Sequence, residues 1–128
     1  MMSKVLKRLT EDLGYPILDE TTLECFLAEP GERVLFLTGD PATNLETDDV
    51  AAILPELVQA FQHRFQAAVV DRSIEQPLRE RYEVWPVPSL IFLCDGEMTG
   101  AIPKVRDWTD YLAEIKTILD RPATSVRQ

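Results

Sequence analysis

The sequence predicts an α/β fold in which a central mixed β-sheet is flanked by helices. Two short apolar segments, at 34–37 and 67–71, stand on either side of a long amphipathic segment, which is the pattern of a β-α-β unit. Such a unit has parallel strands joined by a right-handed crossover. Farther along, the apolar run Leu90–Cys94 ends at Asp95-Gly96, a strong signal for an antiparallel hairpin. A parallel pair and an antiparallel pair together indicate a mixed sheet.

Four elements are expected before the long helix. Apolar residues at helical spacing predict a short first helix, and an edge strand can follow because Pro16 is tolerated at a sheet edge. Thr21 and Glu24 have the spacing of a capping box, which opens the second helix. The elements are a helix, an edge strand, a helix and a buried strand, at Lys4–Leu13, Tyr15–Leu18, 21–28 and Arg33–Thr38.

The long helix carries the clearest periodic pattern in the chain. Apolar residues repeat at helical spacing from Val50 through to about Arg64. Thr47 is the expected N-cap, and the acids that follow it suit the positive end of the helix dipole. Pro55 lies inside the pattern and predicts a kink just before it.

The remaining elements complete one domain that spans residues 1–128. A helix is expected over Ser73–Tyr82, and the hairpin should return through Met98–Ile102. A last helix is expected over Trp108–Leu119, with Asp107 as its cap. The core of the domain is expected at about 15–120, with a frayed tail at Ala123–Gln128.

The charge distribution limits which classes of partner the protein can bind. The net charge is −9, and residues 1–56 carry nearly all of the excess, with 12 acidic and 4 basic residues. Nucleic acid is an unsuitable partner because its phosphates would be repelled. A basic partner and a simple solvated acidic surface both fit. The chain has no apolar run near the roughly 20 residues that a membrane helix needs, and no apolar stretch follows its basic N-terminus. We therefore expect no membrane insertion and a cytoplasmic location.

Residues that could carry chemistry are few, and no metal or other cofactor is expected. Cys25 and Cys94 form no Cys-x-x-Cys motif, and with a single His63 they do not make a zinc site. Three acids near the start of the long helix could pass for a metal cluster, but neighbouring carboxylates on one helical turn diverge. Trp85 is either a core residue or an exposed anchor for a partner; a core position or partial burial is favoured, and Trp108 is expected to pack.

Over about residues 15–120 the chain resembles the thioredoxin fold. The resemblance depends on the strand Val34–Leu37, the helix kinked at Pro55, the Val-Pro-Ser-Leu sequence at 87–90 and the Asp-Gly hairpin. It implies a thioredoxin-like fold with a cis peptide bond between Val87 and Pro88.

The chain departs from the thioredoxin pattern at the redox motif. Counting back from the helical proline places Thr-Asp-Asp-Val, residues 47–50, on the four Cys-x-x-Cys positions, so dithiol exchange at this site is excluded. Cys94 should be buried in the central strand and inert. A single-cysteine redox enzyme using Cys25 stays open as an alternative.

Without its cysteines, a thioredoxin fold still offers a peptide-binding groove. The resemblance implies that backbone groups beside the cis-proline pair with an extended peptide. An acidic rim beside an apolar floor would suit a peptide that is basic at one end and apolar further along. The candidate peptide-binding residues are Asp40, Glu46, Asp48, Asp49, Trp85, Val87 and Pro88.

The whole chain also resembles the HyaE/HupG family of hydrogenase accessory proteins. The matching features are the short first helix, Phe-Leu-Thr-Gly-Asp-Pro at 36–41, the acidic helix start, Trp-Pro-Val-Pro-Ser-Leu at 85–90 and the Asp-Gly hairpin. The resemblance implies a non-catalytic chaperone that binds the twin-arginine signal peptide of the [NiFe]-hydrogenase small-subunit precursor before export. Other hydrogenase accessory proteins are further candidate partners.

The sequence leaves two alternatives open. A structural scaffold that binds the mature subunit is an alternative to signal-peptide recognition. The acidic recognition site can also lie elsewhere, among Asp19, Glu20 and Glu24.

Overall fold

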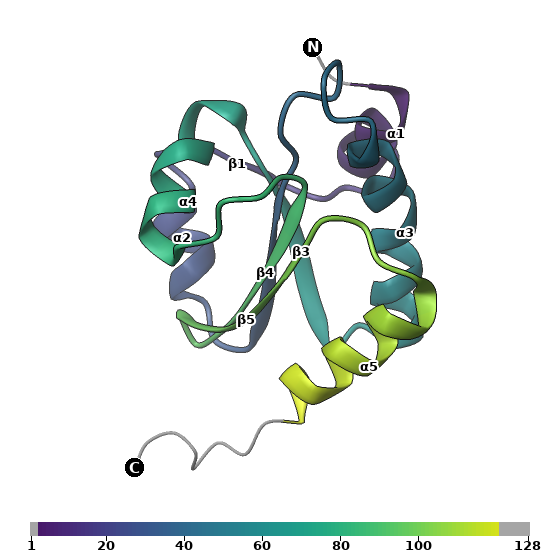
Figure 1. Cartoon of the computed structure of the whole chain (residues 1–128). Helices are drawn as coiled ribbons and strands as arrows, with labels where there is room; N and C mark the ends of the chain where they lie inside the picture. The colour runs from purple at the N-terminus through teal and green to yellow at the C-terminus, as the bar shows by residue number, and fades with distance from the viewer. Residues whose placement is uncertain (1–2, 121–128) are drawn as a thin grey trace.

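The computed structural model describes residues 3–120, which form a five-stranded mixed sheet between two layers of helices (Figure 1). The strand order is β1-β3-β2-β4-β5. The strand β3 runs parallel to both β1 and β2, whereas β4 is antiparallel to β2 and to β5, so the predicted mixed sheet is confirmed. The strands are β1 (Ile17–Leu18), β2 (Glu32–Leu37), β3 (Phe65–Val70), β4 (Ser89–Cys94) and β5 (Glu97–Pro103).

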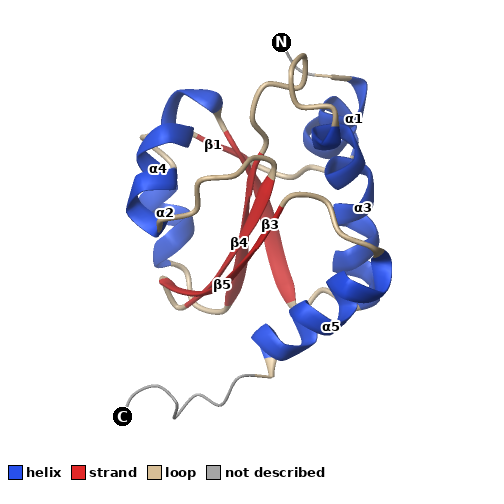
Figure 2. Cartoon of the chain, viewed as in Figure 1, coloured by secondary structure: helices blue, strands red, loops and turns tan. Residues whose placement is uncertain are grey.

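The helices divide between the two faces of the sheet. Figure 2 shows α2 and α4 on one side of the strands and α1, α3 and α5 on the other. A π-helical turn at Arg8–Asp12 continues α1, and a 3₁₀ turn at Arg72–Ile74 leads into α4. The helices are α1 (Lys4–Lys7), α2 (Leu23–Ala28), α3 (Glu46–Ala60), α4 (Glu75–Tyr82) and α5 (Trp108–Leu119).

The continuous apolar runs of the central strands follow from this two-sided cover. Along β2, Val34 and Phe36 belong to the core under α3 and α5, whereas Leu35 and Leu37 belong to the core on the opposite face. Successive side chains of a strand point to opposite faces, so a strand covered on both sides needs apolar residues at every position.

Two predicted helix caps are wrong. The helix α3 begins at Glu46, and the buried Thr47 hydroxyl instead donates a hydrogen bond to the carbonyl of Thr38 at 2.5 Å. No capping box opens α2 at Thr21, because the Asp19 carboxylate accepts the hydrogen bonds of that turn. Asp107 does occupy the N-cap position of α5, but its side chain makes no capping hydrogen bond.

Several single-residue expectations were also tested by the structure. The peptide bond between Val87 and Pro88 is cis, as predicted. Pro55 lies inside α3, which continues past it for more than one turn. Trp85 is 49% exposed, which excludes a core position and leaves the partial burial that was also predicted, and Trp108, which was expected to pack, is 39% exposed. Trp85 lies in the segment before β4 and Trp108 is the first residue of α5, and neither belongs to the two clusters of core side chains.

Two expectations concern the ends of the chain. The helix α5 ends at Leu119, as predicted. The tail expected at Ala123–Gln128 lies outside the described residues. Among residues 3–120, no helix is long and apolar enough to cross a membrane.

Candidate functional site

Three loops meet at one end of the sheet and form the candidate site. They are the β2–α3 loop, the turn that precedes β4 and the β5–α5 loop, which follow or precede strands at the upper end of the sheet in Figure 1. The backbone N–H of Lys104 donates to the carbonyl of Pro88 at 2.7 Å, and the N–H of Val105 donates to Glu46 Oε1 at 3.2 Å. These two bonds tie the β5–α5 loop to the cis-proline turn and to the start of α3.

Gly39 allows the β2–α3 loop to approach the cis-proline turn. It is buried and has a φ of +69°, a region that glycine adopts without steric cost. A Cβ at this position would lie 2.8 Å from Val87 Cγ2 and 2.9 Å from Asn44 Nδ2. Only glycine therefore fits here without displacing its neighbours, a requirement that the loop-like composition of this segment did not reveal.

The buried carboxylate of Glu75 binds the backbone of Gly39. Glu75 Oε2 accepts a hydrogen bond from the Gly39 N–H at 2.8 Å, and its Oε1 lies 3.4 Å from the guanidinium of Arg72. The Thr38 hydroxyl donates to the Gly39 carbonyl at 2.9 Å. The sequence marks Glu75 only as a polar position in a helical segment, so its structural role was missed. No local pattern pairs it with a residue 36 positions earlier.

Asp40 shapes the loop that follows Gly39. Its Oδ1 accepts from the Ala42 N–H at 3.0 Å, and its carbonyl accepts from the Asn44 N–H at 2.8 Å. The predicted site residue Asp40 therefore lies at the site, and one of its carboxylate oxygens stabilises the loop.

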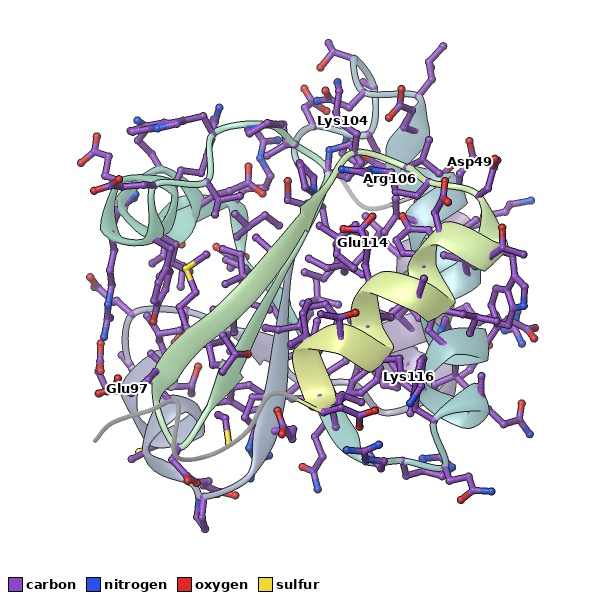
Figure 3. All side chains as sticks on the ribbon, turned by 60° about the horizontal axis from the view of Figure 1, so that its bottom comes forward. Asp49, Glu97, Lys104, Arg106, Glu114 and Lys116 are labelled. Atoms are coloured by element: carbon purple, nitrogen blue, oxygen red, sulfur yellow. The ribbon has the colours of Figure 1, made fainter. Side chains whose placement is uncertain are left out.

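The three acids at the start of α3 lie together, but two of them have partners within the fold. Glu46 accepts from Val105, and Asp48 Oδ1 accepts from the Ser3 hydroxyl at 2.6 Å. Asp49 is exposed. Figure 3 shows Lys104 and Arg106 at the same end of the molecule as Asp49. The predicted acidic rim therefore contains basic residues as well.

Arg106 is itself paired. Its guanidinium lies 2.9 Å from the carboxylate of Glu114, and its Nε donates to the carbonyl of Pro103 at 3.1 Å. These contacts direct its charge toward the first turns of α5. Lys104 is exposed at the end of β5, with a φ of +65°.

Apolar side chains border the cis-proline turn. Trp85 is half exposed, Val87 is half buried and Pro88 is buried. Leu45, directly before α3, is 83% exposed and was missed as a candidate, although an isolated leucine next to a loop of small and polar residues is a usable signal. We name Gly39, Leu45, Trp85, Val87 and Pro88 the cis-proline surface.

The backbone of Val87 is available for pairing. Within residues 3–120, neither its N–H nor its C=O makes a hydrogen bond. The neighbouring carbonyls are occupied, since that of Trp85 accepts from the Arg79 guanidinium and that of Pro86 accepts from the Ser89 hydroxyl. An extended segment laid beside Val87 could therefore pair with it as an added strand.

The two thiols lie away from this surface. Cys25 is exposed on α2, and Cys94 is half buried at the end of β4, which corrects the prediction that it is buried. Burial, followed by the nearby carboxylates of Glu32 and Asp95, raises the pKa of the Cys94 thiol. A raised pKa disfavours the reactive thiolate. In the described part of the chain, no three or more His, Cys, Asp or Glu side chains are grouped to hold a metal ion.

Comparison with known sequences connects the chain to hydrogenase biogenesis. A family model described as hydrogenase-1 expression protein HyaE matches residues 5–111. The chain is 47% identical over 116 residues to the hydrogenase expression/formation protein HupG of Rhodobacter capsulatus, covering 90% of this chain and 84% of that protein. It is 41% identical over 121 residues to the hydrogenase expression/formation protein HoxO of Azotobacter vinelandii, covering 93% and 80%.

Solved structures of similar proteins have the same fold as this chain. The crystal structure of a hydrogenase expression/formation protein HupG from Rhodopseudomonas palustris matches with a TM-score of 0.59 and 38% identity, covering 84% of this chain and 99% of that one. A thioredoxin from Halobacterium salinarum matches with a TM-score of 0.62 and 20% identity, covering 80% and 87%. The second likeness concerns the fold alone and confirms that it is thioredoxin-like.

Proposed function

The chain belongs to the HyaE family of hydrogenase expression proteins, and we propose that it is a non-catalytic chaperone for the twin-arginine signal peptide of a [NiFe]-hydrogenase small-subunit precursor. As a hydrogenase expression/formation accessory protein, it acts during maturation of the enzyme. In the proposed role it binds the leader in the cytoplasm and delays export until assembly is complete. The observation that supports this role is the cis-proline surface, where the unpaired backbone of Val87 lies among exposed apolar side chains.

Binding at this surface needs no chemistry from the protein. An extended leader segment would pair its backbone with Val87, and its apolar side chains would contact Leu45 and Trp85. Burying exposed leucine and tryptophan side chains supplies most of the affinity, since transfer of apolar surface from water is the dominant favourable contribution.

In the proposed complex, the acidic residues near the cis-proline surface contribute mainly to the orientation of the peptide. Asp40, Glu46, Asp48 and Asp49 lie at the end of the molecule that the peptide would approach, and Asp49 is the most exposed of the four. Exposed ion pairs contribute only about 0–1 kcal/mol each. Several acids near a pair of arginines therefore increase the association rate and the specificity more than the affinity.

The proposal predicts binding that depends on the leader. Purified protein should bind the small-subunit precursor with its twin-arginine leader and lose most of that binding when the leader is deleted, because the leader provides the extended segment. The double variant Leu45→Ser/Trp85→Ala should bind the precursor at least about tenfold more weakly, as expected for two contact residues of this size. Calorimetry or biolayer interferometry at low and high salt measures both effects.

A matched control tests whether weaker binding is specific to the cis-proline surface or follows from the loss of any two exposed apolar side chains. Leu13→Ser/Met98→Ala also truncates two exposed apolar residues, on other parts of the molecule, and should bind the precursor like the wild type. Binding that ignores the leader would contradict the proposal and favour a scaffold for the mature subunit. Equal binding by both double variants would place the contact elsewhere on the chain.

The redox alternative makes a different prediction. If the protein is a non-catalytic chaperone, Cys25→Ser should support hydrogenase activity in cells as well as the wild type does, because no step uses the thiol. The substitution changes one exposed side chain and should leave the fold intact. Loss of hydrogenase activity in a variant that accumulates to the wild-type level would instead favour a single-cysteine redox role.

A further inference from the structure

A second surface lies beside the cis-proline surface, on the other side of the β2–α3 loop. A hollow of about 280 Å³ opens at the ends of β1 and β3, and Thr38 and Pro41 of the loop form part of its lining. Ile17 and Val69 are neighbours in the parallel register and line it together with Leu6 of α1. Because the short α1 leaves Ile17 42% exposed, the hollow has an apolar lining that is open to solvent.

Acidic residues continue this hollow. An adjoining hollow of about 400 Å³ shares Ile17 and Asp71 with the first and adds Asp19 and Glu20. Asp19 and Asp71 directly follow two paired strands, since Leu18 pairs with Val70. We name the combined feature the β1–β3 groove, defined by Leu6, Ile17, Asp19, Glu20, Pro41 and Asp71.

Hydrogen bonds favour the ionised form of two carboxylates of the groove, those of Asp19 and Asp71. Hydrogen bonds from Thr21 and then Thr22 lower the pKa of Asp19, and hydrogen bonds from Ser73 lower the pKa of Asp71. In both residues a single carboxylate oxygen accepts these bonds, Oδ1 in Asp19 and Oδ2 in Asp71. The second oxygen of each can therefore accept from a ligand.

The positive charge that lines the groove is already paired. The guanidinium of Arg72, which also lines the groove, lies 3.4 Å from the carboxylate of Glu75. Glu24, the third acid of the alternative recognition site, pairs with Arg81 at 2.9 Å. The groove thus combines an open apolar hollow with an excess of negative charge, contributed by Asp19, Glu20 and Asp71.

We propose that the β1–β3 groove binds the basic part of an extended peptide, with arginine side chains against its carboxylates and an adjoining apolar side chain over Ile17. The proposal rests on the proposed function and assigns the arginine pair of the leader to this groove. Glu46 and Asp48 are less available for that role because both are partly buried, whereas Asp19 and Glu20 are exposed.

One peptide can reach both surfaces. The strand order places β1 three strands from β4, and adjacent strands lie about 4.8 Å apart, so the separation is about 14 Å. An extended chain advances about 3.3 Å per residue, so four or five residues span it. A peptide with arginines in the β1–β3 groove can therefore place the apolar residues that follow them at the cis-proline surface, and arginines followed by apolar residues are the order of a twin-arginine leader.

The test removes the three charges without changing the shapes of the side chains. The triple variant Asp19→Asn/Glu20→Gln/Asp71→Asn keeps the acceptor oxygens that the two turns need. It should bind a synthetic small-subunit signal peptide roughly tenfold more weakly than the wild type at low salt, and the difference should shrink at high salt. Asp49→Asn should have a smaller effect. In ¹³C-methyl spectra, the peptide should shift the δ1 methyl of Ile17 and leave that of the buried Ile115 unchanged.

The matched control is Glu56→Gln/Glu97→Gln/Asp110→Asn, which removes three exposed carboxylates elsewhere and changes the net charge equally. Figure 3 shows Glu97 at the end of β5 opposite to Lys104. If the two triple variants bind equally well and the Ile17 methyl does not move, the groove assignment is overturned, while leader binding that is weakened by Leu45→Ser/Trp85→Ala still supports the proposed function. If the wild type does not bind the peptide at all, both proposals fail.

Discussion

Replacing Gly39 with alanine is expected to lower the free energy of unfolding by about 2–5 kcal/mol and to weaken leader binding. An alanine held at a φ of +69° carries about 1–2 kcal/mol of conformational strain. Its Cβ would also meet Val87 Cγ2 at 2.8 Å, and overpacking of this kind costs about 1–3 kcal/mol. Relief of the clash requires Val87 to move, which alters the surface that the peptide would contact. Urea unfolding and peptide titration measure the two effects.

Gly14→Ala is the matched control for Gly39→Ala. Gly14 has a similar φ of +75°, but a Cβ there would meet nothing within 4 Å. In this variant the free energy of unfolding should fall only by the cost of backbone strain, about 1–2 kcal/mol. Its binding of the leader should equal that of the wild type. Equal losses of stability in the two variants would show that the close approach of Gly39 to Val87 contributes nothing.

Replacing Phe92 with alanine is expected to cost about 3–5 kcal/mol of unfolding free energy. Phe92 is fully buried at the centre of β4, and its ring packs edge-on against Phe65 with the centroids 5.5 Å apart. It pairs in register with Val34 of β2, so the cavity would open between the middle of the sheet and the helices α3 and α5. A loss of this size is a large fraction of the stability of a typical domain.

Phe61→Ala supplies the comparison for Phe92→Ala. Phe61 is only partly buried at the C-cap of α3, and its ring lies 6.1 Å from that of Phe65. Its truncation should lower stability by clearly less, because solvent can fill part of the space that the ring leaves. Urea midpoints with unchanged slopes distinguish the two variants. A smaller loss for Phe92 than for Phe61 would contradict the packing described for the centre of the sheet.

Much of the fold follows from local patterns in the sequence. The apolar runs of β2, β3 and β4 are continuous because both faces of the sheet are covered, and the Asp95-Gly96 turn sets the antiparallel return. The periodic pattern of α3 gives its length to within a few residues. These elements were predictable because strand alternation, helical spacing and tight turns are properties of neighbouring residues.

The positions of functional side chains were predicted less completely. Val87 and Pro88 lie at the expected turn, but the sequence did not decide between a core position and partial burial for Trp85, and Leu45 was missed. Exposure of a single large side chain depends on whether another element covers it. Two of the acids at the start of α3 proved to have partners in the N-terminal segment and in the β5–α5 loop, which are far away in sequence.

The sequence by itself determined the fold class, the absence of the thiol pair at the start of α3 and the family to which the chain belongs. Only the tertiary structure decided which polar groups are occupied and which are available. Glu75 supports Gly39 from 36 residues away, and Asp19 and Asp71 become neighbours through the pairing of β1 with β3. The physical reason is that hydrogen bonds and hollows form between segments that folding brings together, whereas periodicity reports only on residues that are already adjacent along the chain.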